Sequence, residues 1–203
     1  MAREKNSSKA TSVKPAARIP RLGAAGRAAI TSAPAMKKVP IVSSAHLASG
    51  QSAELSEFEF GLIIASNAFN RWAVRCMSAA GMKDMTITDV LVLHHINHRA
   101  REKKLADIAF ILNIEDTHIV NYSLKKLHSL GLVKAERRGK EVLYSTNEAG
   151  QGLCTRYFVT REEVLVSGLT GDGMESFELS ELARFLRILS GLYDQAARAA
   201  TSM

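Results

Sequence analysis

The chain has 203 residues, of which 46% are hydrophobic and 23% charged, and its formal net charge is +7. This length allows one folded domain with an appendage, or two small domains. No uninterrupted apolar run reaches the ~18 residues of a membrane-spanning helix, so we expect no membrane association. Two cysteines, Cys76 and Cys154, cannot build the disulfide framework of a small secreted domain, and no apolar signal-peptide core opens the chain. We therefore expect a cytoplasmic protein.

Positive charge is concentrated in the first 50 residues, which hold nine basic side chains and one acid, Glu4. All four prolines fall in this segment, which has no aromatic residue. Because the segment lacks bulky apolar side chains to offset its chain entropy by burial, we predict a disordered basic tail over residues 1–52. Three roles are open: binding a phosphate backbone, serving as a transit peptide, or only keeping the protein soluble.

Long apolar helices are predicted at both ends of the remaining chain. From Leu55 to Cys76, apolar residues recur at alternating spacings of three and four, which predicts a helix over residues 53–80 with a seam for a partner helix. Two further helices are predicted over residues 147–168 and 175–200. Their apolar faces are larger than one small domain can cover.

Shorter helices are predicted between these ends. Thr86, followed three residues later by Asp89, resembles a capping box and predicts a helix over residues 87–98. Apolar residues at helical spacing predict the next helix over Lys104–Leu112.

A fourth helix is predicted from Asp116, a candidate N-cap, to Gly131. Its residues Val120, Leu124 and Leu127 lie within an arc of about 60° at 100° per residue, so they form the buried face. The opposite, polar face consists of His118, Asn121, Tyr122, Lys125 and Ser129, with Lys126 at its edge.

A change to a period of two follows Gly131. Residues 132–137 and 141–146 predict two strands around Gly139, forming a hairpin with a basic tip. The basic residues of this tip are Arg137, Arg138 and Lys140. Helix, short link, helix and hairpin is the plan of a winged helix-turn-helix, here over residues 83–146.

Several short motifs occur in the order found in one regulator family. The stretches that carry the similarity are Lys104–Ala109, like an LAxxL helix, Lys125–Val133, like an LxxxGLV turn, and Thr146–Gly150, close to an LTxxG segment. With the outer helices in place, residues 53–200 resemble the MarR family of transcriptional regulators. The tight tip at Arg138 departs from the family's longer wing, which carries an Asp-x-Arg pattern.

The resemblance implies a mostly α-helical fold with a small β-hairpin wing, in which dimerisation helices flank a winged helix-turn-helix domain. It also implies a homodimer on double-stranded DNA with a pseudo-palindromic operator. Independently, the polar face of the fourth helix offers groups for base edges, and Lys126 with the wing offers charge for phosphates. Residues 83–144 carry a net positive charge, whereas the outer helices carry a net negative one. A solvated polar surface is the plainer alternative.

The resemblance further implies a small effector, often aromatic or phenolic, that binds between the dimerisation helices and the winged helix-turn-helix domain. The candidate lining residues are Arg71, Trp72, Arg75, Cys76 and His94. Trp72 and Cys76 fit a packed helix seam equally well.

Other classes of function make different demands on the sequence. A sequence-tolerant architectural DNA binder would use the same charges, and a winged-helix module for protein interactions would keep the fold alone. We expect no enzyme, because the chain has neither a Gly-rich phosphate loop nor a nucleophile elbow. We also expect no cofactor and no metal, since His94 and His98 share a helix face without an evident third ligand. A redox role for Cys76 or Cys154 is left open.

Overall fold

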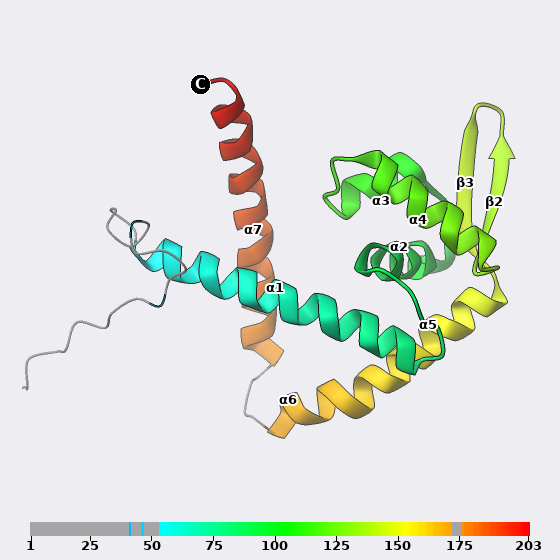
Figure 1. Ribbon diagram of the computed structural model, residues 1–203, viewed down its shortest axis with the longest axis horizontal. Coiled ribbons are helices and arrows are strands. Elements are labelled where there is room, and N and C mark those ends of the chain that lie inside the picture. The colour runs from blue at the N-terminus through cyan, green and yellow to red at the C-terminus, as the bar shows by residue number, and fades with distance from the viewer. Residues whose placement is uncertain (1–40, 42–45, 47–52, 172–175) are drawn as a thin grey trace, which may run out of the picture. The chain divides into compact units, whose positions relative to one another are not determined.

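The computed structural model describes Ile41, His46, residues 53–171 and residues 176–203. The predicted tail therefore lies almost entirely outside the described residues. Within them, no helix is both long enough and apolar enough to cross a membrane. In chain order (Figure 1) the elements are α1 (Ala53–Ala79), α2 (Ile87–Asn97), a 3₁₀ turn (His98–Ala100), β1 (Lys103–Lys104), α3 (Leu105–Ile111), α4 (Thr117–Ser129), β2 (Val133–Arg138), β3 (Glu141–Thr146), α5 (Glu148–Arg161), a π-helical turn (Glu162–Val166), α6 (Ser167–Gly171) and α7 (Ser176–Thr201).

The core brings α2 and α4 together, with contributions from the end of α1 and from α5. Met77 of α1 and Leu153 of α5 are fully buried in it. The fully buried side chains of α2 and α4 are Val90, Val92, Leu93, Ile96, Val120, Leu124 and Leu127. Burying one such side chain is worth roughly 1.5–3 kcal/mol, so this packing is what fixes α4 on α2. The predicted apolar face of α4 is confirmed.

Capping bonds begin α2 and α4 where the sequence predicts them. The Thr86 Oγ1 atom accepts a hydrogen bond from the Asp89 N–H (3.2 Å), and Asp89 Oδ2 accepts one from the Thr86 N–H (2.8 Å). At the start of α4, Asp116 Oδ1 accepts a hydrogen bond from the His118 N–H (2.9 Å). These bonds satisfy N–H groups that the first turn of a helix leaves unpaired.

The wing is a three-stranded antiparallel sheet in the order β1-β3-β2. β2 and β3 form the predicted hairpin, and Gly139 in its turn has a φ of 62°, a conformation that glycine adopts at little cost. The third strand, β1, was not predicted. Lys103 pairs with Tyr144, and Lys104, which the sequence analysis placed in a helix, is extended. A strand of two residues is too short to show a period in the sequence.

The helix predicted over residues 147–168 is interrupted. Asn147 caps α5, which ends at Arg161, and a π-helical turn then leads into α6. Gly168, the last residue of the predicted helix, lies within α6, which continues to Gly171. Apolar spacing cannot reveal such a change in hydrogen-bond pattern, because π turns occur as short insertions in α-helices. The helix predicted over residues 175–200 agrees with α7.

Gly150 of α5 lies close to the residue that precedes β2, because a Cβ atom at Gly150 would overlap the backbone carbonyl of Leu132. We predict that Gly150→Ala destabilises the fold by about 1–3 kcal/mol, since this backbone must move to admit the methyl group. Gly152→Ala is the matched control: its Cβ would lie 3.6 Å from the Arg156 guanidinium, and we expect stabilisation of about 0.5–1 kcal/mol. Urea unfolding measures both, and equal free energies of unfolding would contradict the close approach.

Candidate nucleic-acid interface

The outward face of α4 is polar and accessible. His118, Lys125 and Ser129 are exposed, Asn121 is half-buried, and the Tyr122 side chain is 70% exposed. Because the opposite face of the helix is fully buried, α4 cannot turn these groups inward without losing its packing. The predicted outward face thus exists as a surface, with hydrogen-bonding groups of the kind that contact base edges in the major groove.

Lys126 is engaged differently from what the sequence suggested. Its Nζ atom lies 2.7 Å from Asp89 Oδ2 and donates a second hydrogen bond to the Asp84 carbonyl oxygen at 2.6 Å. The Asp89 side chain is wholly buried. Lys126 thus already pairs with a buried carboxylate, and its expected contact with a phosphate stays a prediction.

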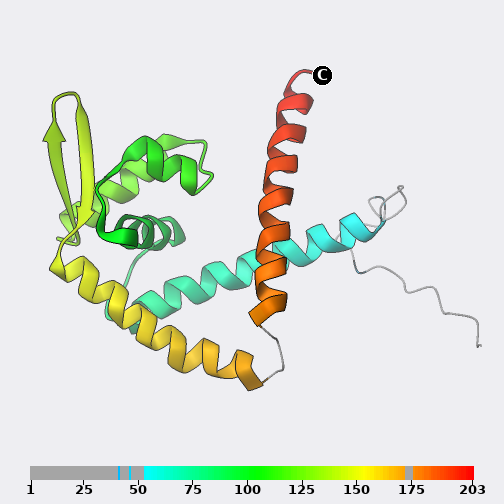
Figure 2. The same ribbon diagram turned by 180° about the vertical axis from the view of Figure 1, so that it is seen from behind.

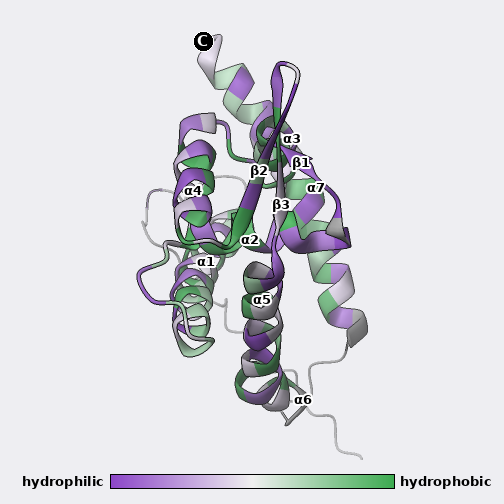
Figure 3. Ribbon diagram, turned by 90° about the vertical axis from the view of Figure 1, so that its right-hand side faces the viewer, coloured by the Kyte–Doolittle hydropathy of each residue, from purple (hydrophilic) through white to green (hydrophobic). Residues whose placement is uncertain are grey.

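The basic tip of the wing extends beyond α3 and α4 (Figures 1 and 2), and hydrophilic residues dominate it (Figure 3). Arg137, Arg138 and Lys140 are all exposed. Arg138 forms ion pairs with Glu102 (2.8 Å) and Glu136 (3.1 Å). Exposed pairs of this kind are worth little, typically up to about 1 kcal/mol, so phosphate oxygens can replace these carboxylates at small cost.

A groove of about 410 Å³ lies between the start of α2 and the outward face of α4. Its lining residues are Thr86, Thr88, His118, Ile119, Tyr122 and Ser123. The groove adds Thr86 and Thr88 to the candidate surface. Sequence reasoning recognised Thr86 only as a helix cap and missed Thr88, because nothing local indicates that α2 begins beside α4.

The five residues predicted to line an effector site do not converge. Arg71 and Arg75 line one hollow of about 340 Å³ on α1. Trp72 packs against the core, and Cys76 is buried in it, with its thiol 3.6 Å from the Tyr157 carbonyl oxygen. In the single chain these five residues therefore do not line one hollow, and the effector site stays a prediction. Arg71 and Arg75 are four residues apart and share a face that is turned by one residue, about 100°, from the face of Trp72 and Cys76.

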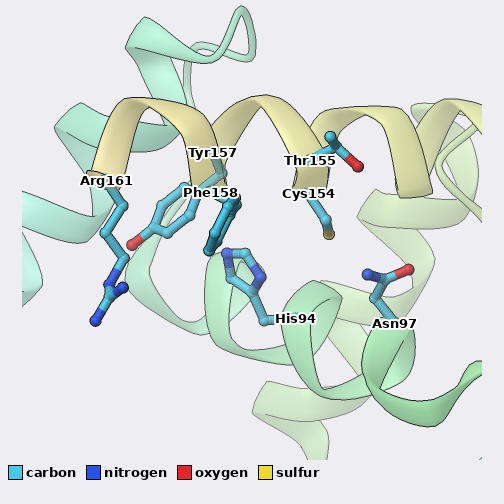
Figure 4. Close-up of a pocket in the computed structure, with 7 residues that line it drawn as sticks. All are labelled: His94, Asn97, Cys154, Thr155, Tyr157, Phe158 and Arg161. Carbon is cyan, nitrogen blue, oxygen red and sulfur yellow. The ribbon is translucent and has the colours of Figure 1, made fainter. Parts of the chain in front are cut away.

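His94 belongs to a different cavity, of about 390 Å³, between α2 and α5 (Figure 4). Its lining residues are His94, Asn97, Cys154, Thr155, Tyr157, Phe158 and Arg161. The His94 and Tyr157 rings meet edge to face at 4.4 Å between centroids. Burial lowers the pKa of His94, and its Nε2 atom has no hydrogen-bond partner among the described residues. A neutral imidazole, aromatic rings and one arginine therefore face the same space.

Both thiols are poor candidates for a redox switch. Cys76 and Cys154 are buried, and burial raises the pKa of each, that of Cys154 to about 11. Because the thiolate is the reactive form, these environments suppress oxidation at neutral pH.

The outer helices leave many apolar side chains accessible. α1 and α7 touch through the Phe58 and Phe185 rings, whose centroids are 5.9 Å apart, and the Tyr193 hydroxyl donates to Glu59 at 3.1 Å. Large apolar side chains on these two helices nevertheless remain at least 36% exposed, namely Leu55, Leu62, Ile63, Ile64, Phe69, Leu179, Leu182, Phe185, Leu186, Ile188, Leu192 and Tyr193.

Comparison with known proteins agrees with this architecture. Residues 85–150 match the family model described as a winged helix DNA-binding domain. A crystal structure of a mutant MarR from E. coli complexed with operator DNA matches with a TM-score of 0.56 at 17% identity, covering 70% of this chain and 99% of that one. This chain has the MarR fold.

Two further crystal structures show the same MarR fold. A protein from Listeria monocytogenes, described as a MarR family regulator and complexed with a 26mer DNA, matches with a TM-score of 0.54 at 17% identity, covering 64% of this chain and 85% of that one. A MarR family regulator from Rhodococcus sp. RHA1 matches with a TM-score of 0.53 at 14% identity, covering 70% of this chain and 95% of that one. A search of curated proteins gave no match. The resemblance and the fold class expected from the sequence are confirmed at the level of the fold.

Proposed function

We propose that this chain is a dimeric, sequence-specific DNA-binding transcriptional regulator of the MarR type. One observation carries the proposal: α4, the second helix of a winged helix-turn-helix, buries one face completely and presents hydrogen-bonding side chains on the other. The DNA complexes of the E. coli and Listeria proteins with the same fold support it.

The polar face of α4 and the tip of the wing carry different chemical groups and would contact different parts of DNA. Asn121, Tyr122 and Lys125 present amide, phenol and ammonium groups that can distinguish base edges, with His118 and Ser129 beside them. Arg137, Arg138 and Lys140 on the wing carry charge for phosphates, which all sequences share. Loss of a base contact should therefore lower sequence preference, whereas loss of a phosphate contact should lower affinity for every sequence.

Asn121→Ala should reduce affinity for a selected duplex by ~1–3 kcal/mol and leave binding to random DNA nearly unchanged, because a base contact is lost. Arg138→Ala should weaken both duplexes alike and reduce the slope of log K against log salt by about 1, because a phosphate contact is lost. Fluorescence anisotropy between 50 and 200 mM salt measures both. Equal loss on both duplexes from Asn121→Ala would refute its role.

The same titration separates the alternative functions. An architectural binder would show a steep salt dependence but little preference for the selected duplex. A winged helix that only binds proteins would show no salt-dependent DNA binding.

We further propose a twofold dimer formed by α1, α5 to α6, and α7. A single α4 contacts only a half-site, and pairing two copies would cover the exposed apolar side chains of the outer helices. Phe158, Val159 and Val164 of α5 and the π-helical turn are also exposed in the single chain, and we include them in the proposed interface.

Leu182 and Leu192 on α7 are 50% and 55% exposed in the single chain, so charges there need not disturb its own core. We expect Leu182→Glu with Leu192→Glu to convert the dimer into monomers in sedimentation experiments at micromolar concentration. Gln195→Glu, at another exposed position on the same helix, should remain dimeric. A monomeric wild-type protein would contradict the proposed dimer.

For regulation, we propose that the cavity between α2 and α5 binds a small aromatic or phenolic acid. The His94, Tyr157 and Phe158 rings offer apolar and edge-to-face contacts, and Arg161 offers a charged donor for a carboxylate. Because α4 packs against α2, a ligand bound in this cavity can shift α2 and with it the position of α4.

Arg161→Gln should weaken binding of a hydroxybenzoic acid at least tenfold, since a hydrogen bond to a charged group is worth about 1.5–3 kcal/mol. Arg71→Gln tests the site first expected on α1 and should have no effect. Calorimetry measures both affinities, and release of a bound duplex reports the coupling. Loss of binding with Arg71→Gln alone would move the site back to α1.

A further inference from the structure

Lys126 and Asp89 join the reading helix to the helix that supports it. Lys126 lies in α4, Asp89 lies in the first turn of α2, and 37 residues of sequence separate them. Their side chains meet at 2.7 Å, with Lys126 26% exposed and Asp89 not exposed at all.

The same carboxylate oxygen performs two tasks. Asp89 Oδ2 accepts the hydrogen bond from the Thr86 N–H that closes the capping box of α2, and it also accepts the bond from Lys126. Lys126 further holds the carbonyl of Asp84, whose φ of 60° is unusual for a residue other than glycine. One ammonium group thus ties α4 to both the start of α2 and the preceding loop.

Apolar packing alone does not provide a directional contact between α4 and α2. Val120, Leu124 and Leu127 hold α4 against α2 by contacts without a preferred direction. A charge-assisted hydrogen bond is short and directional, and an unpaired charge left at a buried position is strongly unfavourable. The ion pair therefore adds a directional restraint on small shifts of α4 to the restraint that the packing already imposes.

The position of Lys126 on α4 determines which groups this restriction affects. His118, Tyr122 and Lys126 are spaced four residues apart and form one row along the helix. His118 and Tyr122 also line the groove against Thr86 and Thr88. Fixing Lys126 at the start of α2 thus fixes the distance between this row and α2.

We propose that the Lys126–Asp89 ion pair positions α4 for base recognition and that Lys126 is a positioning residue, not a phosphate contact. This inference rests on the proposed function. The two roles differ in what they do to DNA binding: a phosphate contact adds affinity for every sequence and steepens the salt slope, whereas a positioning contact adds preference for the selected sequence.

Two variants separate these roles, studied in the full chain at a temperature where circular dichroism shows them folded. Lys126→Met should lower the ratio of selected to random affinity at least tenfold, with the random-duplex affinity and the salt slope unchanged. Lys126→Arg, which keeps the ion pair, should retain the ratio. Lys134→Met is the matched control and should retain the ratio, because this lysine is exposed on β2 and belongs to neither the proposed base contacts nor the wing tip.

Asp89→Asn gives the sharper test and remains informative if Lys126→Met does not fold. Asparagine keeps an oxygen for the Thr86 N–H but frees the Lys126 ammonium from its carboxylate. A positioning role predicts a lower preference ratio, and the double variant Asp89→Asn with Lys126→Met should lose no more than either single variant. A phosphate-contact role predicts tighter binding to both duplexes and a steeper salt slope.

Either an unchanged preference ratio in Asp89→Asn or a salt slope reduced by about 1 in Lys126→Met would overturn the proposal. Failure of the wild-type chain to bind DNA with salt dependence and sequence preference would instead overturn the proposed function. The wild-type measurement is made first, so the two failures are distinguishable.

Discussion

The proposed DNA-binding face of α4 depends on the carboxylate of Asp89, which pairs with a lysine of that helix. This carboxylate begins α2 through the capping box and receives the one lysine by which α4 is tied to α2. Burial by itself raises the pKa of a carboxyl group, but the hydrogen bonds from Lys126 and Thr86 outweigh burial and hold the Asp89 pKa below its ordinary value. The carboxylate therefore stays ionised at neutral pH, and its contribution to stability is present there. That contribution is lost only as the pH falls through the lowered pKa.

This arrangement relates the fold to the proposed function. The apolar face of α4 supplies the energy that holds the helix, and in our proposal the ion pair sets its direction. In the proposed function the polar face then meets a duplex, and the wing contacts its phosphates. The far end of α2 carries His94 and Asn97 into the cavity against α5. α2 thus contacts both α4 and the candidate effector cavity, so a ligand in the cavity could act on α4 through α2.

The sequence predicted what depends on local pattern. The 3.6-residue period of α4 identified its buried face, Thr86 and Asp116 marked the starts of helices, and Gly139 marked the turn of the hairpin. It did not predict what depends on residues far apart in the chain. Lys126 looked like other exposed lysines because its partner lies 37 positions away, and β1 was too short to show a period.

The effector residues show the same limit. His94 lines a cavity, but the α1 residues grouped with it lie elsewhere, and most other residues of that cavity come from residues 154–161 of α5. Proximity of α2 and α5 is a property of the packed fold, so composition and spacing could not indicate it. The DNA-binding role of each residue on α4 likewise remains a proposal from surface chemistry.

The central claim is that the outward face of α4 enters the major groove. Photocrosslinking tests it most directly, with the photoreactive amino acid p-benzoylphenylalanine in place of Tyr122, which is 70% exposed, and in place of the exposed Gln195 on α7 as the control. We expect the probe at position 122 to crosslink to bases of a selected duplex and the probe at position 195 to give no crosslink. Binding of the duplex without a crosslink from position 122 would contradict the account.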